Sequence, residues 1–154
     1  MLFQPSPPPP GERPPTHRGP IALLFLAAGI AALSTRWPWV QIKFERLFPG
    51  VTGPVAWQTK AGFTCLCTSL LVAVMALAES GTPESLRAVR PGSLMLVSLA
   101  VLALGAEWLA GPGELRGASA VRTFWFHVAC FAVPLLFLVC WRRYRSMRTR
   151  PEPT

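Results

Sequence analysis

Residues 124–141 read FWFHVACFAVPLLFLVCW, a run without Lys, Arg, Asp or Glu, and Arg142 and Arg143 follow it directly. At about 1.5 Å per residue, a helix of this length reaches roughly 27 Å, close to the thickness of the hydrocarbon core of a bilayer. Arginine next to an apolar run is typical of the cytoplasmic end of a membrane span. The stretch therefore predicts a transmembrane helix that ends at a basic cluster.

Three further apolar blocks precede this one, and together they predict four spans at about residues 20–35, 61–79, 93–110 and 123–141. Hydrophobic residues make up 51% of the 154-residue chain and charged residues only 14%, which disfavours a soluble or strand-rich protein. The connections after the second and third blocks are short and contain Gly and Pro, so neighbouring helices should be antiparallel. We predict an all-α, polytopic integral membrane protein, an up-down four-helix transmembrane bundle.

The first apolar block has two interpretations. It is shorter than the others and ends in Ala32, Leu33 and Ser34, which resembles a signal-peptidase site, and cleavage after Ser34 would leave three helices. The region before the block is long and contains four consecutive prolines at residues 7–10, which favours an uncleaved first helix. Residues 1–19 are then predicted to be a disordered, proline-rich cytoplasmic tail.

The formal net charge of +8 is explained by membrane topology rather than by nucleic-acid binding. With both termini inside, nine of the fifteen Lys and Arg residues lie on the cytoplasmic side, five of them in the tail 142–154. Within that tail, Arg142, Arg143 and Arg145 are predicted to contact lipid headgroups. We expect both termini in the cytoplasm. The abundance of Arg and Pro with no Asn points to a GC-rich bacterial genome, and we therefore expect the bacterial inner membrane.

The longest connection, residues 35–60, also has two interpretations. Val40, Ile42 and Phe44 alternate with polar residues, as in a half-buried strand. Val40, Phe44 and Phe48 equally fall on one face of a helix. Of the two, we predict a short interfacial helix that lies on the membrane surface and covers the end of the bundle.

Aromatic side chains in this first loop form the predicted partner-contact surface: Trp37, Trp39, Phe44, Phe48 and Trp57. Large aromatic residues are enriched where proteins contact one another, and they also gather at the membrane interface. The loop is therefore the part of the sequence best suited to contacting another protein.

Polar residues inside the spans are the candidates for chemistry, because placing them in lipid is costly. Counting along the helices puts Glu107 about 6 Å and His127 about 9 Å below the same membrane surface, with Cys65 and Cys67 at a similar depth. Glu107 and His127 are therefore a candidate polar pair for proton transfer, or Glu107 reaches headgroup water while His127 packs in the bundle. The cysteines lack metal or redox spacing, and we predict no metal site, no cofactor and no catalytic residue.

These observations lead to three hypotheses for function. The first is a non-enzymatic accessory or assembly subunit of a membrane complex, whose partners are the lipid bilayer and another membrane protein or a second copy of the chain. The second is a small oligomeric transporter or channel with Glu107 and His127 along its path. The third is a membrane enzyme that acts on a lipid substrate. A role in binding nucleic acid is not expected.

Overall fold

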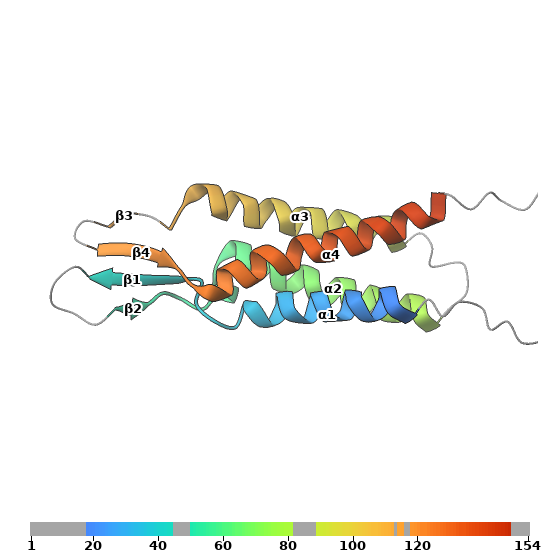
Figure 1. The fold of residues 1–154 in the computed structure, drawn as a ribbon, viewed down its shortest axis with the longest axis horizontal. Helices are drawn as coiled ribbons and strands as arrows, with labels where there is room; N and C mark the ends of the chain where they lie inside the picture. The colour runs from blue at the N-terminus through green and yellow to red at the C-terminus, as the bar shows by residue number, and fades with distance from the viewer. Residues whose placement is uncertain (1–17, 45–49, 82–88, 113, 116–117, 149–154) are drawn as a thin grey trace, which may run out of the picture.

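The computed structural model describes residues 18–44, 50–81, 89–112, 114–115 and 118–148. Its elements follow the order α1 (Arg18–Ser34), β1 (Val40–Phe44), β2 (Val51–Thr52), η1 (Ala56–Gln58), α2 (Lys60–Gly81), α3 (Val89–Ala110), β3 (Glu114–Leu115), β4 (Ala118–Arg122) and α4 (Phe124–Arg148). The four helices lie side by side along the molecule, and the strands lie together beyond one end of them (Figure 1). We call that end the sheet end, and the opposite end, where α1 begins and α4 finishes, the tail end.

The four predicted helices are all present in the described residues, with differences at their ends. Helices α2, α3 and α4 are long and apolar enough to cross a membrane, whereas the apolar part of α1, Gly19–Ser34, is shorter. Helix α4 runs through Pro134 and continues to Arg148, so the first part of the predicted basic tail is helical. The predicted N-terminal tail lies almost wholly outside the described residues.

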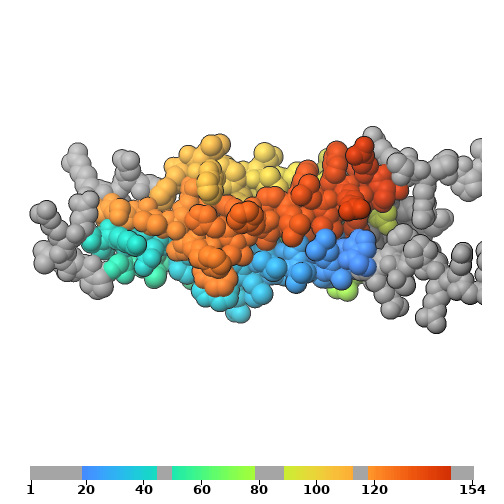
Figure 2. Space-filling model, viewed as in Figure 1, coloured from blue at the N-terminus to red at the C-terminus, as the bar shows by residue number. Residues whose placement is uncertain are grey.

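The helices form a ring in which each one packs against two antiparallel neighbours. Helix α1 contacts α2 and α4, and α3 contacts the same two helices. The pair α1 and α4 lies along the face shown in Figure 2. Alanine is the commonest residue in the buried core, as at Ala27, Ala31, Ala100 and Ala129, and it allows the helix backbones to approach closely.

Beyond the helices, the two connections at the sheet end form one antiparallel sheet with the strand order β2-β1-β4-β3. Strand β1 pairs with β2 and, along its whole length, with β4, from Val40 opposite Arg122 to Phe44 opposite Ala118. Strand β3 pairs with β4 on the far edge. Each connection is thus a hairpin, and the two hairpins lie side by side although α2 and α3 separate them in the sequence.

This sheet corrects the prediction of a short interfacial helix in the first loop and adds strands to a chain predicted to be all-α. Residues 40–44 are extended in β1, and Phe48 lies outside the described residues. The period-two pattern of Val40, Ile42 and Phe44 is the one that the structure follows. The physical reason is pairing: β4 satisfies the backbone hydrogen bonds of β1 from across the molecule, a partner that local periodicity cannot show.

Close contacts at two glycines fix the first hairpin and the start of α2. Gly53 donates its backbone N–H to the Val40 carbonyl oxygen at 2.9 Å, and a Cβ at Gly53 would lie 2.8 Å from that oxygen. The Thr59 hydroxyl accepts the backbone N–H of Gly62 at 3.1 Å and so caps the start of α2. A Cβ at Gly62 would lie 2.0 Å from the carbonyl oxygen of Ala56, so only glycine fits there.

Candidate functional site

The strands join the helices through a cluster of aromatic rings, which we call the aromatic junction: Trp37, Trp39, Trp108, Trp125 and Phe126. The rings of Trp37 and Trp125 are stacked, with centroids 4.1 Å apart and planes 10° apart. Phe126 makes a T-shaped contact with Trp39, with ring centroids 5.4 Å apart, and stacks on Trp108 at 5.7 Å. The junction therefore connects the loop before β1 and the end of α3 to the first turn of α4.

The residues predicted to contact a partner occupy different environments. Trp39 is only 3% exposed, and its indole N–H donates to the Ser34 carbonyl oxygen at 3.1 Å, so this side chain belongs to the core and is not available on the surface. Trp37, Phe44 and Trp57 are partly exposed, at 40%, 40% and 46%. Trp37 is stacked within the aromatic junction, and Trp57 is the most exposed of these three rings.

Arg122, the last residue of β4, binds the end of α3. Its guanidinium donates to the backbone carbonyl oxygens of Glu107 at 2.8 Å and Trp108 at 2.6 Å. The same group lies 4.7 Å from the ring centroid of Trp108 and 4.6 Å from that of Phe126. A cation at the C-terminus of a helix meets unpaired carbonyl groups and the negative end of the helix dipole. Arg122 thus fixes the second hairpin to the helix that precedes it.

The predicted polar pair is not joined by any hydrogen bond or ion pair that the structure describes. Glu107 is half-buried, and it meets Arg122 through its backbone carbonyl oxygen. His127 is exposed on α4, where Nδ1 lies 2.9 Å from the Thr123 carbonyl oxygen. Because a carbonyl oxygen only accepts, Nδ1 is the donor in this hydrogen bond. The His127 and Trp108 rings are nearly perpendicular, with centroids 6.1 Å apart.

The interior of the bundle is apolar, with a few hydroxyl groups. The buried Ser34 and Ser69 hydroxyls donate to carbonyl oxygens of their own helices, at Ala31 and Cys65. In the described part of the chain, no three His, Cys, Asp or Glu side chains gather where they could hold a metal ion. Within the same residues, none of the buried side chains carries a formal charge.

The sheet has one apolar and one polar face, because residues paired across strands point to the same side. Ile42 pairs with Val51 and with Ala120, and Phe44 pairs with Ala118, so these five residues share one face, which we call the apolar sheet face. Val40 and its partner Arg122 are on the same side, at the end of the strands nearest the helices.

Polar residues gather on the opposite face of the sheet, where Gln41 pairs with Thr52 and Lys43 pairs with Ser119. Every strand residue whose burial the structure describes is half-buried or exposed, on both faces of the sheet. Val51 in particular, on the apolar sheet face, is 54% exposed.

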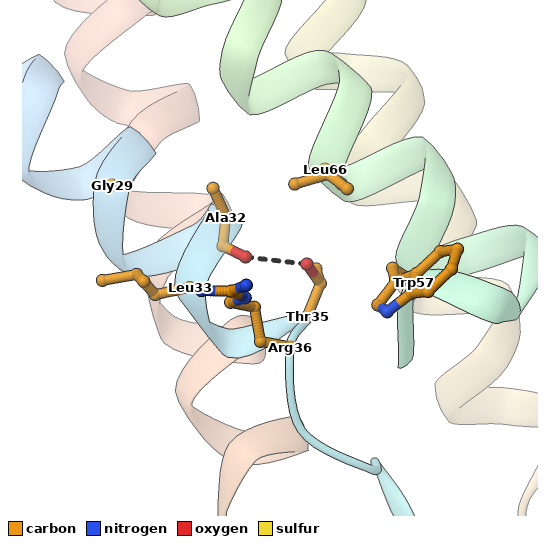
Figure 3. A pocket seen from close by; sticks show the side chains of 7 residues that line it. All are labelled: Gly29, Ala32, Leu33, Thr35, Arg36, Trp57 and Leu66. Atoms are coloured by element: carbon orange, nitrogen blue, oxygen red, sulfur yellow. Dashed lines mark hydrogen bonds between the residues drawn. The ribbon is translucent and has the colours of Figure 1, made fainter. Parts of the chain in front are cut away.

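A groove of about 410 Å³ lies between α1 and α2 near the sheet end (Figure 3). Its walls are formed by the following residues: Gly29, Ala32, Leu33, Thr35, Arg36, Trp57 and Leu66. Thr35 donates its hydroxyl to the Ala32 carbonyl oxygen at 2.7 Å, so that hydroxyl is already satisfied within the chain. The groove is therefore largely apolar, with Arg36 and Trp57 at the sheet end of it.

The basic residues predicted to contact headgroups lie at the opposite end of the molecule. Arg142, Arg143 and Arg145 are in the last turns of α4, at the tail end, and Arg142 and Arg145 are exposed. The ring of Trp141 lies 6.3 Å from that of Tyr144 in the same turns. Aromatic and basic side chains thus gather at the tail end, while the larger aromatic cluster lies at the sheet end.

Comparison with known proteins finds no family model that matches the chain, and no curated protein or solved structure that is similar to it. The interpretation of the site therefore rests on the geometry above. Two residues in that geometry, Arg122 and Thr123, were not singled out from the sequence. Thr123 donates its hydroxyl to the Pro38 carbonyl oxygen at 2.6 Å, across 85 residues of sequence. A loop arginine and a loop threonine carry no local signal of such contacts.

Proposed function

We propose that the chain is a four-span integral membrane protein that serves as a non-enzymatic accessory or assembly subunit of a membrane complex. One observation carries this proposal: the apolar sheet face is built and held in place, yet none of its residues is buried, and Val51 is 54% exposed. An apolar face of a sheet is normally buried against another layer. We therefore propose that a partner protein supplies that layer.

Side-chain placement along the helices supports the membrane part of the proposal. Large apolar residues point away from the bundle, for example Leu26 at 60%, Leu102 at 69% and Phe131 at 79% exposure. The interior is filled mainly by small residues, the reverse of the arrangement in a water-soluble bundle. Helix α1 is short for a span, but it packs beside α2 and α4, which are both long enough. We place all four helices in the bilayer for this reason.

The charge distribution supports the orientation that we propose. Arg142, Arg143 and Arg145 lie at the tail end, together with the start of α1. A basic cluster beside a span is retained on the cytoplasmic side. We therefore propose that both termini are cytoplasmic, that the sheet lies outside the membrane, and that the membrane is a bacterial inner membrane.

The transport hypothesis draws less support from the geometry than the accessory hypothesis does. A path for a polar solute or an ion through one bundle needs polar groups along its interior. The described interior offers hydroxyl groups that already donate to their own helices. His127 is on the outside of α4 and Glu107 is near the end of α3, so a path that uses them would have to run between copies of the chain.

The apolar sheet face can be tested without disturbing the helices. We would replace Phe44 and Val51 together by Thr, because threonine keeps the strand preference while it removes apolar surface. The matched control replaces Lys43 and Ser119 by Thr on the polar face of the same sheet. The tagged protein is purified from its own membranes in mild detergent, and mass spectrometry identifies what elutes with it.

The accessory hypothesis expects a partner in fixed stoichiometry that the Phe44/Val51 variant loses and the control retains. Two results would count against it. In the first, both double variants retain the partner equally, so the apolar sheet face does not hold it. In the second, the unmodified protein elutes as a homo-oligomer without a partner, and transport assays of Glu107→Gln and His127→Ala become the next step.

A further inference from the structure

The groove between α1 and α2 changes in polarity along its length. Its apolar end is deep in the helices: Leu66 lies six residues into α2, and Gly29 lies five residues before the end of α1. At about 1.5 Å per residue these positions are roughly 8 to 9 Å from the helix ends. Arg36 and Trp57, by contrast, lie just beyond the helices at the sheet end. In the proposed membrane placement, the apolar end faces hydrocarbon and the other end faces headgroups.

Arg36 is free to bind a ligand as far as the described residues show. Its side chain is exposed, and no hydrogen bond or ion pair joins it to any described residue. In Figure 3 its guanidinium lies back over the end of α1, and the nitrogen edge of the Trp57 ring faces the groove from the other side. A guanidinium and an indole N–H are both donors, and the guanidinium matches the oxygens of a phosphate.

The size of the groove and its opening to the side suit an extended apolar ligand rather than a compact solute. Its volume of about 410 Å³ is within the range of ligand sites, roughly 300 to 1,000 Å³. Leu33 and Trp57 on its two sides are 53% and 46% exposed, so the groove opens sideways from the bundle. Gly29 leaves the groove wide, because no atom lies within 4 Å of a Cβ built there.

We propose that the groove binds one anionic phospholipid from the leaflet at the sheet end. An acyl chain lies along Gly29, Leu33 and Leu66, and the headgroup phosphate accepts hydrogen bonds from Arg36. The positive charge of Arg36 complements the anionic headgroup, and the apolar walls complement the acyl chain. The inference depends on the proposed membrane placement of α1 and α2, and it is independent of the partner at the apolar sheet face.

The experiment measures lipid retention by native mass spectrometry after delipidation and titration with phosphatidylglycerol or with phosphatidylcholine. Arg36→Gln removes the charge, and Gly29→Leu fills the groove with a side chain that meets no neighbour at its Cβ. Lys43→Gln, on the exposed sheet beyond the helices, is the control for charge. Gly105→Leu, on α3, is the control for bulk, because a Cβ at Gly105 also meets nothing within 4 Å.

We expect one phosphatidylglycerol per chain, held about tenfold more tightly than phosphatidylcholine, because both lipids carry the phosphate but only phosphatidylcholine adds a choline cation, which the positive charge of Arg36 disfavours. Arg36→Gln should remove that preference, and Gly29→Leu should weaken retention of both lipids. Both controls should behave as the unmodified protein. Equal retention of the two lipids by the unmodified protein would overturn the proposal, as would an unchanged preference in Arg36→Gln or equal losses in Gly29→Leu and Gly105→Leu.

Alkaline carbonate extraction of native membranes tests the membrane placement by itself. Release of the chain would refute that placement, and the lipid site with it. Retention of the chain in the membrane, combined with no lipid preference, would refute the lipid site alone. Loss of the partner in the Phe44/Val51 variant, with lipid binding unchanged, is the result expected if both proposals are correct.

Discussion

Replacing Arg122 by Ala should loosen the connection between the sheet and the helices. The change removes two hydrogen bonds, to the carbonyl oxygens of Glu107 and Trp108, and the contacts of the guanidinium with two rings. A hydrogen bond to a charged group contributes about 1.5 to 3 kcal/mol, and a partly exposed cation–ring contact about 0.5 to 1 kcal/mol. Arg122 is half-exposed and the two bonds share one group, so we expect a total loss of about 3 kcal/mol.

The assay is thermal unfolding of the purified protein in one detergent, followed by tryptophan fluorescence. For a chain of this size, about 3 kcal/mol corresponds to a decrease of roughly 6 to 12 °C in apparent Tm. Arg142→Ala is the control, because that side chain is exposed at the tail end. Arg122→Lys should recover less than half of the loss, since an ammonium group lacks the planar guanidinium that lies against the Trp108 and Phe126 rings while Nη2 donates to both carbonyl oxygens.

A double-mutant cycle separates the ring contact from the hydrogen bonds. Trp108→Leu removes the ring and keeps the carbonyl group of residue 108, so its coupling with Arg122→Ala reports the ring contact, which we expect to be about 1 kcal/mol. If Arg122→Ala melts within about 2 °C of the Arg142→Ala control, a shift of only about 1 kcal/mol or less, Arg122 does not hold the sheet to α3 and the reasoning fails.

Three further substitutions test how the sheet end is assembled, with apparent Tm in the same detergent as the measurement. Gly62→Ala should cost about 3 kcal/mol of folding free energy, because the new Cβ would lie 2.0 Å from the Ala56 carbonyl oxygen. Gly105→Ala should instead stabilise α3 by about 0.5 to 1 kcal/mol. Equal shifts in Tm for the two variants would contradict the close approach at Gly62. Trp39→Phe should cost about 2 kcal/mol, because it removes the hydrogen bond to the Ser34 carbonyl oxygen at the end of α1 and leaves a smaller ring in the core. An unchanged Tm would show that Trp39 is not a core residue. Thr123→Val should cost about 1 kcal/mol, since it removes a hydrogen bond of 2.6 Å to the loop before β1, and no change would show that this contact does not align the two hairpins.

Part of the candidate site followed from the sequence, and part required the structure. The aromatic residues of the first loop were recognised as a group, but Trp39 is a core residue that binds the end of α1, while Phe44 and Trp57 are partly exposed. Composition shows that a loop is aromatic, and it does not show which ring points inward. The depth count for Glu107 was consistent with its place near the end of α3, yet depth says nothing about which way a side chain points around the helix axis.

The sequence by itself determined the helices, because a helix closes its hydrogen bonds within its own segment and an apolar run of sufficient length needs no other information. That is why the four predicted blocks correspond to α1, α2, α3 and α4. The sheet was decided by the tertiary structure, since β1 takes its partner from the hairpin between α3 and α4, and the local alternation at residues 40–44 allows a strand without showing what it pairs with. The apolar sheet face, the bonds of Arg122 and the groove at Arg36 all depend on which helices become neighbours, and only the packed bundle decides that.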